Sequence, residues 1–85
     1  MDRSKHHEKS LKVAEQFLKG WSVEDPTAIR MVASIMMHRD GVWQGGGFVE
    51  AVCDNDLYAA ITRADNTSLS YLKLYVIASK NCHAR

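Results

Sequence analysis

The sequence predicts an all-α fold, a compact bundle of about four short helices that forms a single domain over residues 1–85. Apolar residues recur at the three- and four-residue spacing of a helix in four separate blocks. Glycine, proline, aspartate and asparagine separate these blocks, as is typical of helix ends. Apolar residues make up 46% of the chain and charged residues 25%, which is the composition of a globular domain.

The first block predicts an amphipathic helix over residues 4–19. Leu11 and Leu18 lie on its apolar side, Ser4 is placed to cap its start, and Gly20 is placed to end it in a left-handed conformation. The outer side is mildly basic, because lysines outnumber the acidic residues among them: Lys5, Lys9, Lys12 and Lys19 against Glu8 and Glu15.

The second block predicts a helix that begins at Pro26, with Asp25 as its N-cap, and stops near Gly41. From Ala28 through Met37 only two residues are polar. A helix that is apolar over most of its circumference is typical of the centre of a bundle. We therefore expect the other helices to cover this one.

The third block favours one helix over residues 48–64, followed by a turn at Asp65 and Asn66. Its apolar line is formed by Val49, Cys53, Leu57, Ala60 and Ala64. Three consecutive poor helix formers, Asp54 to Asp56, interrupt the block, so an alternative is that Asp54 caps a second, shorter helix.

The last block, residues 68–80, fits a helix but also alternates as a strand would over Leu72, Leu74 and Val76. A lone strand would leave its backbone amides unpaired, and no second strand candidate is present. The helix is therefore the prediction.

Composition and charge exclude several classes of protein. A net charge of +1 argues against both an acidic nucleic-acid mimic and a strongly basic nucleic-acid binder. Apolar runs are too short to cross a membrane, and the N-terminus lacks the apolar core of a secretion signal. Cys53 and Cys82 form no framework of disulfides, which predicts reduced thiols in a cytoplasmic protein.

No residues form a recognisable catalytic or metal-binding pattern, so we expect no enzyme activity, no metal and no cofactor. The histidines are His6, His7, His38 and His83, and the adjacent pairs His6–His7 and Cys82–His83 diverge on a helix. Cys53 lies on an apolar helical line, which is typical of a buried, inert thiol rather than a nucleophile.

The glycine-rich loop before the third block is a weak candidate for anion binding through Gly46 and Gly47. Backbone amides at a helix start can hold an anion, but no lysine follows as in a phosphate-binding loop. A steric requirement for glycine is the stronger interpretation.

Two groups of residues are candidates for contact with a partner. Trp43 and Gln44 lie in the glycine-flanked loop, where a tryptophan either anchors an interface or plugs the end of the core. The second group is polar and comprises Asp54, Asn55, Asp56 and Arg63. On a continuous helix Asn55, Ala59 and Arg63 would share one face. This face would either contact a partner or be a solvated surface with an intrahelical ion pair.

The segment GGFVEAVCDNDLYAAITRAD, from Gly46 to Asp65, resembles a segment of small proteins encoded by phages and prophages. The polar positions that match are Asn55, Asp56, Arg63 and Asp65, and no catalytic residues carry over. The resemblance covers the second half of the chain and implies a bacterial or phage cytoplasmic setting.

We therefore expect a non-enzymatic interaction protein that acts by stoichiometric binding to a host protein or complex. By analogy of size and compactness, it would be a phage-encoded inhibitor of a bacterial antiphage defence complex, similar to anti-CRISPR proteins. The small core also makes self-association an expected mode. The alternative is a small DNA- or nucleotide-binding helical module that uses the basic first helix or the backbone amides after Gly47.

Overall fold

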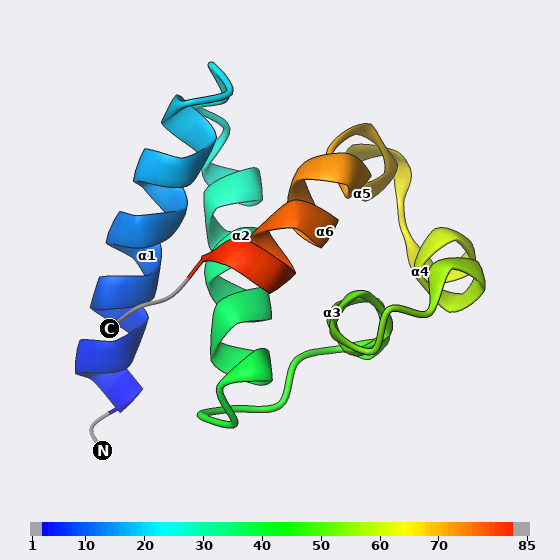
Figure 1. The fold of residues 1–85 in the computed structure, drawn as a ribbon, viewed down its shortest axis with the longest axis horizontal. Helices are drawn as coiled ribbons and strands as arrows, with labels where there is room; N and C mark the ends of the chain where they lie inside the picture. The colour runs from blue at the N-terminus through cyan, green and yellow to red at the C-terminus, as the bar shows by residue number, and fades with distance from the viewer. Residues whose placement is uncertain (1–2, 83–85) are drawn as a thin grey trace.

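In a computed structural model of the chain, the structure describes residues 3–82, which form helices and connecting turns without any strand (Figure 1). The all-α prediction is confirmed, with more helices than the four expected. The six helices of this range are α1 (Arg3–Lys19), α2 (Pro26–Arg39), α3 (Gly47–Cys53), α4 (Leu57–Arg63), α5 (Asn66–Ser70) and α6 (Leu72–Asn81).

Helix α2 is the central element, as its apolar circumference predicts. It packs against α1, α3 and α6, and its fully buried side chains include Val32, Ile35 and Met36. Its start is also as predicted, because the Asp25 side chain accepts a hydrogen bond of 2.9 Å from the Thr27 backbone N–H. From the opposite side, α6 brings the fully buried Tyr75, whose ring meets Phe48 of α3 edge to face.

The ends of α1 differ from the prediction. The helix begins at Arg3, so Ser4 lies inside it rather than capping it. The left-handed residue at its other end is Ser22, with φ of 61°, and not Gly20. The turn at the end of α1 extends past Gly20 and is closed by the backbone N–H of Val23, which donates a hydrogen bond of 2.9 Å to the Leu18 carbonyl. Gly41, with φ of 76°, ends α2 in the way the sequence predicts.

The continuous helix predicted over residues 48–64 is wrong, because the chain forms two helices, α3 and α4. Asn55 adopts a left-handed conformation with φ of 61°, which ends α3. The N–H groups of Asn55 and Asp56 bond back to the carbonyls of Val52 and Ala51, at 3.2 and 2.9 Å. The alternative of two helices is therefore the correct one, but Asp56 caps the second helix and Asp54 does not.

The last block is helical rather than extended, as predicted, but it is also divided. Helix α5 begins at Asn66, two residues earlier than expected, because the Asp65 side chain accepts a bond of 2.7 Å from the Ser68 N–H. Tyr71 then separates α5 from α6. Its hydroxyl donates to Asp25 Oδ2 at 3.4 Å, which ties this junction to the start of α2.

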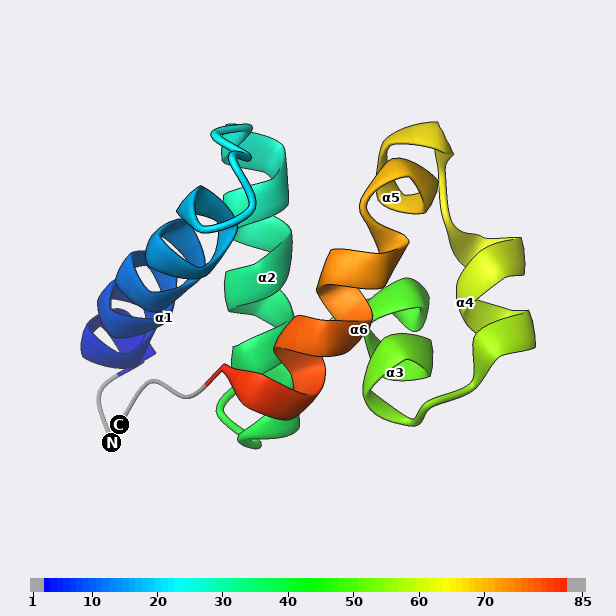
Figure 2. The same cartoon turned by 45° about the horizontal axis from the view of Figure 1, so that its top comes forward.

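The described residues extend over 32 × 28 × 18 Å. Figure 2 shows α1 and α4 at opposite edges, with α2, α3 and α6 between them. Within residues 3–82, no helix has both the length and the apolar character to span a membrane.

Candidate functional site

An open groove of about 580 Å³ lies where α1, α2, the glycine-rich loop and α3 meet. Its walls are mostly apolar, and it is the larger of the two grooves that contain candidate residues from the sequence. We call it the Trp43 groove. Its lining residues are His7, Thr27, Arg30, Met31, Ser34, Met37, Trp43, Gly46, Gly47, Phe48 and Val49.

Trp43 lies in a loop that is attached to the end of α2. The His38 ring accepts a hydrogen bond of 2.9 Å at Nδ1 from the Gly45 N–H, which fixes the loop to the end of α2. A Cβ on Gly45 would lie only 2.6 Å from a methyl carbon of Val49, so this position requires glycine. Trp43 itself remains 40% exposed, with its ring centroid 6.3 Å from that of His7.

Gly46 and Gly47 lie beside Trp43 in this groove, so the structure brings three of the predicted residues together. Gly46 has open space around its Cα, whereas a side chain at Gly47 would press on Arg63, whose Nη1 donates to the Gly47 carbonyl at 3.3 Å. The steric interpretation of the glycines therefore holds at Gly45, whereas a side chain at Gly47 would require only a small shift of the exposed Arg63 side chain. Anion binding by Gly46 and Gly47 stays a prediction.

The groove carries basic groups and no acidic ones among its lining residues. Arg30 and His7 stand at its walls, and no described carboxylate forms an ion pair with Arg30. An apolar groove with a basic rim favours a ligand that presents an apolar group next to a carboxylate.

The second predicted group is not part of this groove, and most of its members have structural roles. Asp56 Oδ1 accepts a bond of 3.1 Å from the Ala59 N–H and so caps α4, while Asn55 supplies the left-handed turn. Because the helix is broken there, the expected shared face of Asn55, Ala59 and Arg63 does not exist. The expected intrahelical ion pair is also absent from the described part of the chain, since Arg63 bonds to a backbone carbonyl instead.

Asp65 belongs to the same set of capping residues. Hydrogen bonds from Ser68, led by its backbone N–H, hold the pKa of the Asp65 carboxyl below its ordinary value.

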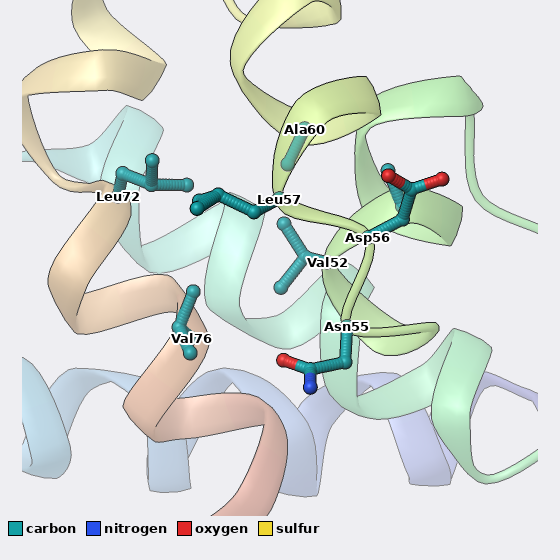
Figure 3. Close-up of a pocket in the computed structure, with 8 residues that line it drawn as sticks. Val52, Asn55, Asp56, Leu57, Ala60, Leu72 and Val76 are labelled. Atoms are coloured by element: carbon teal, nitrogen blue, oxygen red, sulfur yellow. The ribbon is translucent and has the colours of Figure 1, made fainter.

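Asn55 and Asp56 also line a smaller groove between α4 and α6 (Figure 3). Gln44 is exposed, one residue beyond Trp43 in the loop.

The two thiols show no sign of activation. Cys53 Sγ donates a weak hydrogen bond to the Ile35 carbonyl at 3.6 Å, and Cys82 is buried. Burial raises the pKa of both thiols, so both remain protonated at neutral pH. No three metal-ligating side chains converge within residues 3–82, and His83 lies outside that range.

Several residues of these surfaces were not predicted from the sequence. His7 of α1 and Arg30 of α2 reach the Trp43 groove only through helix packing, and no local pattern marks them. The exposed apolar side chains of α4, which are Leu57, Tyr58 and Ile61, were also missed. The sequence did carry a signal for the break, because asparagine tolerates the left-handed conformation better than most residues. A left-handed residue at position 55 changes which side chains of α4 face the core.

No protein-family model, no curated protein and no solved structure matches this chain.

Proposed function

We propose that this chain is a non-enzymatic interaction module that acts by stoichiometric binding of a protein partner at the Trp43 groove. One observation carries the proposal: an open apolar groove of about 580 Å³ contains a tryptophan that is 40% exposed although the loop holding it is hydrogen-bonded to the end of α2. Partly exposed tryptophans in apolar grooves are frequent anchors of protein interfaces.

The chemistry of the groove supports a partner of a defined kind. Met31 and Met37 give the floor flexible side chains that adapt to different shapes. Arg30 and His7 supply donors at the walls, where a carboxylate on the partner would be favourable. The partner segment would therefore place an apolar side chain against Trp43 and an acidic residue toward Arg30.

The finer form of this proposal is a phage-encoded inhibitor of a bacterial antiphage defence complex, active in the host cytoplasm. Its support is the resemblance of the segment from Gly46 to Asp65 to small phage and prophage proteins. Gly46, Gly47 and Phe48, at the start of that segment, form one wall of the groove. The contact surface and the resembling segment therefore overlap.

The experiment compares two tryptophan variants of the same chain. Trp43→Ser removes the proposed anchor, whereas Trp21→Ser removes a tryptophan of similar exposure (46%) that lies elsewhere, near Lys73 Nζ. Each tagged protein is used to recover partners from a bacterial lysate, and the recovered protein is then titrated. We expect a stoichiometric partner whose affinity falls at least about tenfold with Trp43→Ser and little with Trp21→Ser.

The same pair of variants tests the finer proposal in cells. In a bacterium that carries a defence system, expression of the native chain or of Trp21→Ser should raise phage plaquing, and Trp43→Ser should not. Equal effects of the two variants would contradict the assignment of the groove. Recovery of DNA alone, with an affinity that falls steeply with salt, would favour the nucleic-acid alternative instead.

A further inference from the structure

The linker between α3 and α4, together with the first residues of α4, forms an exposed segment that combines acidic and apolar side chains. All five residues from Asp54 to Tyr58 are exposed, and Tyr58 reaches 80%. We call these five residues the 54–58 segment. It places two carboxylates, of Asp54 and Asp56, directly before the large apolar side chains of Leu57 and Tyr58.

This combination is the chemistry that the Trp43 groove favours in a ligand. The present inference therefore rests on the proposed function, in which the groove takes an apolar side chain next to a carboxylate. Arg30 and His7 supply the positive side of that match, and no acidic residue lines the groove. No residue of the 54–58 segment lines it either, so the segment of the same copy does not fill the groove.

We propose that the Trp43 groove accepts the 54–58 segment of a second copy of this chain, with Tyr58 against Trp43 and the carboxylates toward Arg30. The groove has room for the ring, because its volume is about 580 Å³ and a cavity of about 150 Å³ holds a benzene molecule. A tyrosine and a tryptophan gain from packing beyond the area that they bury, and an arginine and a carboxylate form charge-assisted hydrogen bonds.

The distribution of charge over the chain favours the same head-to-tail contact. Over residues 3–39, which include α1 and α2, seven lysines and arginines stand against four acidic residues. Over residues 50–62 the chain has three acidic residues and no lysine or arginine. Figure 2 shows α1 and α4 at opposite edges of the molecule. A contact between the α4 edge of one copy and the α1–α2 side of the next therefore joins opposite charges, whereas two α4 edges would repel.

The contact joins different surfaces of the two copies, so a dimer keeps a free groove at one end and a free segment at the other. Association of this kind continues beyond the dimer. A covered tyrosine buries about 150–250 Å², far less than the about 1,200 Å² of a small stable interface, so we expect a dissociation constant of about 100 μM. A seated copy would also occupy the groove, so the monomer is the form that binds another partner.

Sedimentation velocity of the full chain, from low micromolar concentration to about 1 mM, measures this association. The average mass of the native chain should rise with concentration and exceed that of a dimer at the upper end. Tyr58→Ser and Trp43→Ser should each raise the dissociation constant at least about tenfold. Thr62→Ser, at an exposed position of α4, and Trp21→Ser are the matched controls and should associate like the native chain.

A mixture of the two weakened variants tests the pairing directly. Tyr58→Ser keeps an intact groove, and Trp43→Ser keeps an intact 54–58 segment. An equimolar mixture should therefore form a one-to-one dimer with about the native dissociation constant, and this dimer should not grow further. Raising the salt concentration should weaken it, because the match includes exposed charges.

A native chain that stays monomeric or stops at the dimer would overturn the proposal. So would a mixture that stays monomeric although the native chain associates, or an association that Tyr58→Ser leaves intact. Circular dichroism of each variant separates a lost contact from a lost fold. Failure of the proposed function is a distinct result, because Tyr58→Ser should keep the native affinity for a partner from the bacterial lysate, whereas Trp43→Ser should lose it.

Discussion

At the scale of single residues, the linker Asp54–Asp56 shows how neighbouring polar side chains come to have different roles. Asp54 ends α3 without a hydrogen bond from its side chain to the backbone, and Asn55 supplies the left-handed turn. Asp56 Oδ1 accepts the N–H of Ala59, one of the backbone donors that a helix start leaves without a partner. Truncation to alanine would therefore remove a side-chain hydrogen bond to the backbone only at Asp56.

The difference between the two aspartates is measurable. Asp56→Ala should lower the free energy of unfolding by about 1 kcal/mol, because it removes the N-cap of α4. Asp54→Ala, the matched control two residues earlier, should change it by less than about 0.5 kcal/mol. Urea unfolding followed by circular dichroism, at a concentration where the chain is monomeric, gives both values. Equal losses in the two variants would contradict the capping role.

Tyr75 provides a prediction about pH. Its side chain is fully buried, and burial, followed by the nearby carboxylate of Asp25, raises its pKa from 10 to about 12. In the unfolded chain Tyr75 loses its proton near pH 10, while the folded chain holds it until about pH 12. The unfolded state therefore binds fewer protons in this window, so stability must fall as the pH rises through it.

The expected loss approaches about 2 kcal/mol at the upper end of that window. The control is Tyr75→Phe, which keeps the aromatic ring that packs on Phe48 but has no ionisable group. Urea unfolding from neutral pH to about pH 12 should show a steeper decline for the native chain than for the variant. Parallel declines would mean that Tyr75 does not cause the effect.

At the scale of helices, the sequence predicts best where capping residues and periodicity agree. Asp25 and Pro26 begin α2, Gly41 ends it, and the apolar residues between them face neighbours on several sides. Over residues 48–64 the apolar spacing continues through the linker, so periodicity alone favours one helix. The left-handed Asn55 breaks that register, and Leu57, expected in the core, is instead exposed.

The candidate site was predictable only in part for a related reason. Trp43, Gly46 and Gly47 are close in sequence, and the glycines around the tryptophan indicate a loop with a special role. His7 and Arg30 join them only through the packing of α1 on α2, which no local pattern specifies. No local sequence pattern therefore predicts His7 and Arg30, the residues that give the groove its charge.

At the scale of the whole molecule, contacts at the C-terminal end of α2 join helices that are distant in sequence. Arg39 Nη1 donates to the Ser79 carbonyl of α6 at 3.1 Å. On the other side, His6 Nε2 of α1 lies 3.3 Å from Asp40 Oδ2, without the alignment of a hydrogen bond. Together with the core around α2, these contacts predict that α1 and α6 unfold together with α2.

The two tryptophans report on this prediction, because Trp21 lies in the connection from α1 to α2 and Trp43 in the connection from α2 to α3. Trp43→Phe leaves Trp21 as the only tryptophan, and Trp21→Phe leaves Trp43. In each variant, urea unfolding followed by fluorescence should coincide with unfolding followed by circular dichroism, because small cooperative domains unfold in one step. If fluorescence of Trp21 changed before the helical signal was lost, α1 would be a separate cooperative unit. The expectation of one domain over residues 1–85 would then be wrong. The burial of Leu18 against α2 would not be sufficient to couple the unfolding of α1 to that of the other helices.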